Sequence, residues 1–197
     1  MKKTIPVFLA LCVMLLGLVG CGATGSNSGT AELTFNGKKY QIQHVEFAVE
    51  VNPVIGKPNL VRTIERGKPQ AIRFSLRTER WGAKLWDGKA FVIAWWKDGD
   101  DPMKLLNDYV GRELTDDDRR DDAIYANFLL DGKSIEPALA SGASSWIIID
   151  KVEDGMVSGR FAGRFRLKDG KTFKSIGEAT IEGGSFSAPL RINFERK

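Results

Sequence analysis

Three features of the sequence predict an antiparallel all-β domain of about ten strands, arranged as a sandwich or a barrel with one or two short helices. Asn-Gly-Lys or Asp-Gly-Lys recurs between apolar segments at positions 36, 87, 131 and 169, and such pairs favour the tight turns of β-hairpins. Several segments alternate apolar and polar residues, whereas one segment has clear helical spacing. Because a helix could cover the outside of a central strand, α+β is the alternative class.

Residues 1–20 are expected to be a signal peptide. Lys2 and Lys3 precede an apolar run from Val7 to Val19, which at about a dozen residues is shorter than the roughly 20 that a membrane span needs. No lysine or arginine follows before Lys38, so the positive flank of a retained anchor is missing. The pattern favours a cleaved secretion signal.

The end of this run, Leu18-Val19-Gly20-Cys21, resembles the lipobox of bacterial lipoproteins. The resemblance implies cleavage before Cys21, a diacylglycerol on its sulfur and a further acyl chain such as palmitate on its amino group. The protein would then be held at the membrane of the cell envelope by this lipid. Gly22, rather than aspartate, implies the outer membrane facing the periplasm in a Gram-negative source.

Composition limits the rest of the mature chain. Residues 21–30 hold the cysteine and a segment rich in glycine, serine and threonine, which is expected to be a flexible tether. Residues 31–197 are expected to form a single β-rich domain. Removal of residues 1–20 takes away two of the 29 basic residues and none of the 25 acidic ones, which leaves a net charge of +2. That charge does not favour a nucleic-acid partner. With Cys12 removed and Cys21 lipidated, no disulfide or cysteine nucleophile is expected.

Alternation gives two strands an apolar face and a basic face. In 157–167 the arginines Arg160, Arg164 and Arg166 oppose valine, phenylalanine and leucine, and in 71–78 Arg73 and Arg77 oppose Ile72, Phe74 and Leu76. Segments 90–96 and 146–149 are apolar throughout, which predicts central strands that are covered on both sides. In 40–51 the apolar positions change from even to odd, which predicts a bulge near His44.

One region reads as helix. Asp101 and Pro102 form a helix start, and Met103, Leu106 and Val110 share a face before Gly111. A second short helical turn is expected after Thr115. Further turns are expected at 153–156 and at 182–185, where Glu-Gly-Gly-Ser occurs.

The basic strand face is the strongest candidate for partner binding. Arg160, Arg164 and Arg166, extended by Arg73 and Arg77, would attract an acidic protein or glycan. Trp95 and Trp96 are a second candidate, because aromatic side chains grip protein partners and stack on sugars. Neighbouring residues of a strand point to opposite faces, so at least one of these two tryptophans lies off the main core.

No catalytic residue, metal site or cofactor is predicted. His44 is the single histidine and fits a hydrogen-bonded strand position. The acidic run from Asp116 to Asp122 could begin a calcium site, but its spacing differs from an EF-hand loop and two arginines interrupt it. A solvated helix start is the preferred interpretation of this run.

Function is expected to be non-enzymatic binding of a partner or ligand by a lipid-anchored envelope protein. The segments "GMVSGRFAGRF" and "IEGGSFSAPL" resemble the terminal strands of envelope lipoproteins with β-sandwich or barrel domains. An immunity or inhibitor protein that blocks a toxic enzyme is one alternative. A hydrolase that uses carboxylates alone is another, although no spacing identifies its acidic pair.

The lipobox yields a direct test. Cys21→Ser should leave the precursor uncleaved, because the side chain that accepts the lipid is gone, and mass spectrometry of the native protein should show an acylated Cys21. An unmodified thiol at Cys21, or cleavage at another position, would contradict the lipoprotein interpretation.

Overall fold

The computed structural model describes residues 28–54, 68–79, 89–117, 122–131, 133–137, 145–169, 172 and 174–193. The expected signal peptide, the lipobox and most of the tether lie outside these described residues. The described residues form one helix, α2 (Pro102–Asp108), and ten strands: β1 (Gly29–Phe35), β2 (Lys38–Val51), β3 (Gln70–Thr78), β4 (Ala90–Gly99), β5 (Glu113–Thr115), β6 (Tyr125–Leu130), β7 (Lys133–Pro137), β8 (Ser145–Glu153), β9 (Met156–Asp169) and β10 (Ser175–Asn193).

The strands pair in a closed ring. Its order is β1, β2, β3, β4, β6, β7, β9 and β10, which pairs again with β1. Strand β8 pairs with β9 beside β7, and β5 pairs with β8. Among the ten strands, only the contact of β10 with the second half of β2 is parallel. The all-β expectation is confirmed, and of the two architectures expected the closed pairing is that of a barrel.

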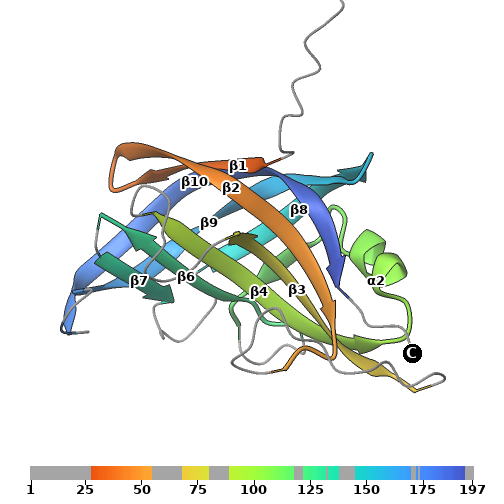
Figure 1. The fold of residues 1–197 in the computed structure, drawn as a ribbon. Helices are drawn as coiled ribbons and strands as arrows, with labels where there is room; N and C mark the ends of the chain where they lie inside the picture. Colours follow the sequence, from red (N-terminus) through yellow and green to blue (C-terminus); the bar gives the residue numbers. More distant parts are fainter. Residues whose placement is uncertain are drawn as a thin grey trace, which may run out of the picture.

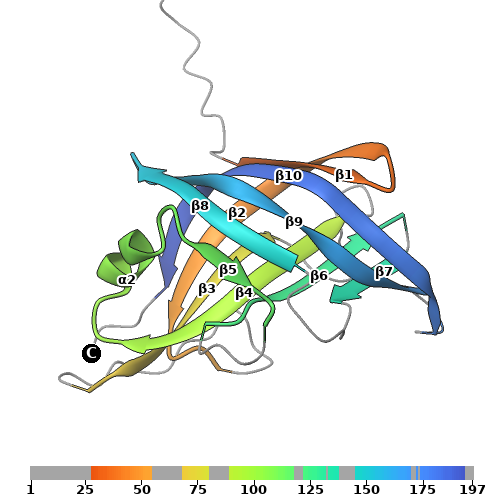
Figure 2. The ribbon, with the colours of Figure 1, turned by 180° about the vertical axis from the view of Figure 1, so that it is seen from behind.

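The two walls of the ring are visible in Figure 1. Strands β1, β8, β9 and β10 lie on one side of the interior, β3, β4, β6 and β7 lie on the other, and β2 runs from one side to the other. Figure 2 shows α2 and β5 beside β8 from behind. The side chains of Leu106 in α2 and Tyr109 just after it are buried in the core, so the helix closes a part of the barrel that strands leave open.

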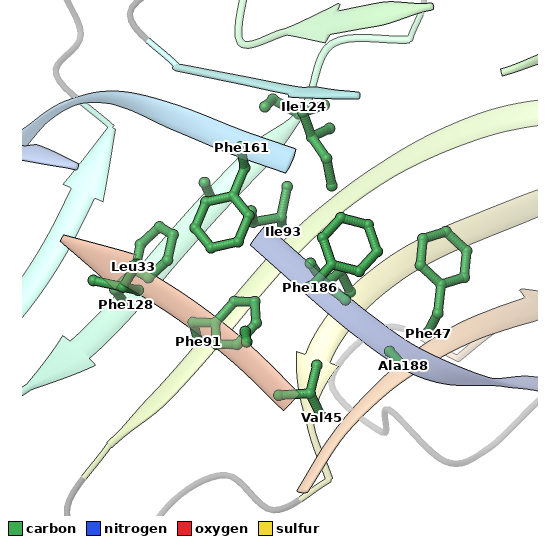
Figure 3. Packing of buried hydrophobic residues seen from close by; sticks show 14 of the residues in the cluster. Leu33, Val45, Phe47, Phe91, Ile93, Ile124, Phe128, Phe161, Phe186 and Ala188 are labelled. Atoms are coloured by element: carbon green, nitrogen blue, oxygen red, sulfur yellow. The ribbon is translucent and has the colours of Figure 1, made fainter. Parts of the chain in front are cut away.

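Aromatic side chains from both walls fill the interior (Figure 3). Phe91 of β4 stacks on Phe128 of β6 at 5.5 Å between ring centroids and on Phe161 of β9 at 5.8 Å. Trp95 stacks on Phe74 at 5.5 Å in a second group. Each large apolar side chain buried in this way contributes about 1.5–3 kcal/mol, so the cross-barrel contacts supply much of the stability.

Two of the expected hairpin turns have the predicted backbone. Asn36 and Gly37 have φ values of 47° and 75°, and Asp154 and Gly155 have 52° and 73°, as a type I′ turn requires. Asp131 also has a positive φ. The turn at 87–88 and Gly170 lie outside the described residues. The turn expected at 182–185 is wrong, because these residues lie inside β10, where its register with β9 shifts between Ile181 and Gly184.

The expected bulge at His44 is confirmed. Gly29 of β1 lies opposite Val45, whereas Thr30 lies opposite Gln43, so His44 is the extra residue on β2. Its φ is 58°. The insertion turns both Ile42 and Val45 into the core, where each is at most 2 % exposed, although the two positions differ in parity.

The helix begins as expected. The carboxylate of Asp101 accepts hydrogen bonds from the backbone N–H of Met103 and Lys104 at 3.0 and 2.9 Å, and Pro102 is the first helical residue. The second helical turn expected after Thr115 is not present in the described residues that follow it, Asp116 and Asp117, which have no regular secondary structure.

The bulge in β10 contains two glycines with opposite surroundings. A Cβ on Gly184 would overlap the ring of Phe161, whereas a Cβ on Gly183 would have no atom within 4 Å. Gly184 therefore makes room for a core aromatic, and Gly183 faces open space on the outside of the barrel.

These surroundings predict that alanine lowers the stability of the domain at Gly184 and leaves it nearly unchanged at Gly183. Gly184→Ala should lower the free energy of unfolding by about 1–3 kcal/mol, because it overpacks the core against Phe161. Gly183→Ala should change it by less than about 0.5 kcal/mol. Urea unfolding followed by tryptophan fluorescence measures both, and equal effects would contradict the packing described.

Candidate functional site

The outer face of β9 carries the predicted row of arginines. Arg160, Arg164 and Arg166 are exposed, whereas Phe161 and Phe165 between them are buried at 1 % exposure. The alternation in the sequence is therefore confirmed: the phenylalanines pack in the barrel and the arginines point outward. Strand β10 lies alongside, with Ser185 opposite Arg160, Thr180 opposite Arg164 and Glu178 opposite Arg166.

Arg160 is held by an exposed carboxylate. Its Nε donates to Oδ2 of Asp150 at 3.0 Å and its Nη2 donates to Oδ1 at 2.9 Å. This bidentate hydrogen bond raises the pKa of Arg160 and lowers the pKa of Asp150. The Nη1 group has no protein partner among the described residues, so Arg160 is oriented by Asp150 while keeping donors for another group.

Arg164 and Arg166 have no ion pair with any carboxylate in the described part of the chain. They are two residues apart on one face of β9, which places their Cα atoms about 7 Å apart. Arg166 has a glutamate opposite it on each neighbouring strand, Glu178 on β10 and Glu136 on β7, without a described ion pair. The two exposed guanidinium groups at this spacing are the part of the arginine row that no described ion pair holds.

Arg73 and Arg77 do not extend this row. They lie on the outer face of β3, on the opposite side of the barrel in Figure 1, and each donates to the carboxylate of Glu50, at 3.3 and 3.1 Å. Nε of Arg77 also donates to Glu46 at 2.8 Å. Glu50 is fully buried. Two glutamates neutralise the two arginines, so their expected role in the basic face is replaced by a structural one.

The two adjacent tryptophans lie on opposite faces of β4, as expected. Trp95 is completely buried and packs on Phe74 and Phe47, so it is not available to a partner. Trp96 is 42 % exposed, and the Arg73 guanidinium lies 5.9 Å from its ring centroid. Tyr125 of β6, opposite Ala94, is 54 % exposed on the same outer face and was not predicted from the sequence.

A groove of about 550 Å³ lies beside Arg160 on the outer face of β9, β10, β1 and β2. Strand register builds it as two rows across the barrel wall. One row runs from Arg160 through Ser185 and Glu32 to Gln41, and a second from Gly183 through Thr34 to Lys39. Both rows consist of glycine and of polar or charged residues. The apolar side chains beneath them, Leu33 and Tyr40, belong to the core and are only 3 % and 7 % exposed.

The middle of the groove is lined by small residues and by Glu32, and its sides by long residues. Gly183, Ser185 and Thr34 come from the central strands β10 and β1, whereas Arg160 stands on β9 and Lys39 on β2. Three strand spacings of about 4.8 Å separate the two outer strands, or roughly 14 Å. No local sequence pattern predicts this groove, because its sides come from segments far apart in the chain.

The acidic run forms structural contacts where it is described. Asp116 accepts a hydrogen bond from Ser145 at 2.8 Å, and the buried Asp122 pairs with Arg112 at 2.6 Å. Asp118 and Asp121 lie outside the described residues. Among those that are described, no three histidine, cysteine, aspartate or glutamate side chains gather as metal ligands. A helix long and apolar enough to cross a bilayer is likewise not found in this part of the chain.

Comparisons of the chain with models of protein families, with curated proteins and with solved structures found no match.

The buried ion pairs of Glu50 and the exposed ion pair of Asp150 with Arg160 predict different losses of stability on mutation. Glu50→Ala should lower the free energy of unfolding by about 3–5 kcal/mol, because it leaves two largely buried arginines with one carboxylate. Asp150→Ala should cost less than about 1 kcal/mol, since its ion pair with Arg160 is exposed. Chemical denaturation of both variants measures the difference, and a small effect at Glu50 would mean that the cluster is hydrated in solution.

Proposed function

We propose that this protein is a lipid-anchored lipoprotein of the bacterial cell envelope whose β domain binds an acidic partner without catalysing a reaction. The arginine row of β9, with Arg160, Arg164 and Arg166, is the proposed binding face. The anchor is the lipid expected on Cys21, and the proposed location is the outer membrane facing the periplasm if the source is Gram-negative.

The observation that carries the proposal is the exposure of Arg164 and Arg166 without an ion pair in the described structure. Of the other five arginines in the described structure, Arg73, Arg77, Arg112 and Arg160 meet carboxylates, and Arg191 of β10 is exposed without a described ion pair. Exposed positive charge that no ion pair holds, at two neighbouring positions, attracts an anionic surface and speeds its association. Because the side chains face outward, they can meet such a surface without any change in the core.

The proposal is tested with Arg164→Ala/Arg166→Ala in the full-length lipidated protein. Retention on an immobilised polyanion such as polyglutamate should fall about tenfold, since each exposed ion pair contributes up to about 1 kcal/mol. Raising the salt concentration should weaken the wild type in the same direction.

The control variant is Lys104→Ala/Arg191→Ala, which removes the same charge from exposed positions on α2 and β10. Equal losses in both variants would show that net charge alone governs retention and would overturn the proposed face. Unfolding curves that match the wild type exclude loss of structure as the cause.

A further inference from the structure

We infer that the groove formed by β9, β10, β1 and β2 binds a short acidic oligosaccharide. This inference rests on the proposed binding function and names the chemical class of the ligand. Arg160 and Lys39 on the two outer strands would bind acid groups toward opposite ends of the ligand, and the hydroxyl and carboxylate groups between them would bind sugar hydroxyls.

The first argument is the distribution of hydrogen-bonding groups. Arg160 lies at one side of the groove, Lys39 and Gln41 lie at the other, and Ser185, Glu32 and Thr34 lie between them. A purely anionic ligand would be repelled by the carboxylate of Glu32 at the centre. A saccharide places hydroxyl donors there, and a carboxylate is the strongest acceptor that a side chain can offer to them.

The second argument is the state of Arg160. Asp150 already accepts from Nε and Nη2, so the guanidinium is oriented before a ligand arrives and loses less freedom on binding than an unpaired arginine would. Its Nη1 donors are unused by described protein groups. An oriented arginine at the edge of a polar groove is suited to a carboxylate or sulfate carried on a sugar.

The third argument is the shape of the floor. Gly183 lies outside the left-handed region and its absent side chain would meet no protein atom, so neither backbone strain nor packing requires glycine there. Glycine instead keeps the groove open between its two sides. The volume of about 550 Å³ lies within the range of small-molecule sites.

A folded protein partner fits the groove less well. Protein interfaces concentrate their binding energy in buried aromatic and apolar anchors, and the apolar residues that line this groove, Leu33 and Tyr40, are buried beneath its floor. The exposed aromatics Trp96 and Tyr125 lie on β4 and β6, away from the four strands that form it, so sugar binding in the groove would rest on hydrogen bonds and charge and not on aromatic stacking.

The test uses isothermal titration of the full-length protein with three probes. These are tetragalacturonate, which is an acidic tetrasaccharide, an uncharged tetrasaccharide of glucose, and the peptide tetraglutamate. Tetragalacturonate should bind at least about tenfold more tightly than either of the others, because it alone combines acid groups with sugar hydroxyls. Equal binding of tetraglutamate would overturn the inference.

Gly183→Leu fills the groove and should weaken tetragalacturonate at least about tenfold, whereas the matched variant Ser175→Leu, exposed near the start of the same strand, should leave it unchanged. Arg160→Gln should reduce the preference for the acidic over the uncharged tetrasaccharide. Unfolding curves of all three variants verify that they fold. Unchanged binding by Gly183→Leu would overturn the inference.

The failure of this inference and the failure of the proposed function are distinguishable. If polyglutamate retention depends on Arg164 and Arg166 while tetragalacturonate does not bind, the arginine row binds acidic partners and the groove is not a sugar site. If tetragalacturonate binding depends on Gly183 while the Arg164→Ala/Arg166→Ala variant retains polyglutamate as the wild type does, the groove is confirmed and the binding role proposed for Arg164 and Arg166 is wrong.

Discussion

Strand β10 provides the backbone pairing on which the closed barrel depends. One of its edges pairs with β9 from Ser175 to Pro189, and the other pairs first with β1 and then with β2. Three strands from opposite ends of the sequence are therefore fixed by one strand. The groove follows from this arrangement, because it lies where β9, β10, β1 and β2 run side by side.

The pairing of β9 with β10 also needs complementary side-chain sizes. Glycine stands where an aromatic ring of the other strand must fit: Gly184 accommodates Phe161, and Gly159 accommodates Phe186. These two contacts interlock the strands on the core side. On the outer side the same strands present Arg160, Ser185 and Gly183, so one stretch of chain determines both the core and the groove.

Charge is distributed in two ways on the outside of the barrel. On β2 and β3, two glutamates and two arginines neutralise each other, and Glu50 is entirely buried among them. On β9, Arg160 has one carboxylate, and Arg164 and Arg166 have no described ion pair. A buried neutral cluster contributes chiefly to the integrity of the sheet, whereas an exposed charge without an ion pair is available to another molecule.

Local patterns in the sequence predicted local features well. The change of parity around His44 correctly predicted a bulge, and the alternation in β9 correctly separated Phe161 and Phe165 from the arginines. Both inferences need only the side-chain geometry of one strand. The Glu-Gly-Gly-Ser segment was misread as a turn, because a glycine pair in a strand bulge has the same composition as one in a hairpin.

Features that depend on which strands are neighbours could not be predicted. Arg73 and Arg77 have the same alternation as the β9 arginines, and only the pairing of β3 with β2 places Glu46 and Glu50 beside them. The groove joins residues 32–41 to residues 160–185, and no local pattern connects these segments. Tyr125 is the first residue of the short strand β6, and the pairing of β6 with β4 determines which face of β6 is exposed.

The junction between the β1–β2 turn and β10 bears on how the chain reaches this structure. Asn36 and Thr180, which are 144 residues apart in sequence, exchange two hydrogen bonds of 3.2 Å. Contacts of such separation form late and slowly, because a long loop must be closed before they stabilise anything. Until β10 arrives, β1, β2 and β9 each present an unpaired edge that can recruit another chain. The barrel is thus most exposed to aggregation before its last strand docks, and we expect a chain that emerges N-terminus first to need protection during that interval.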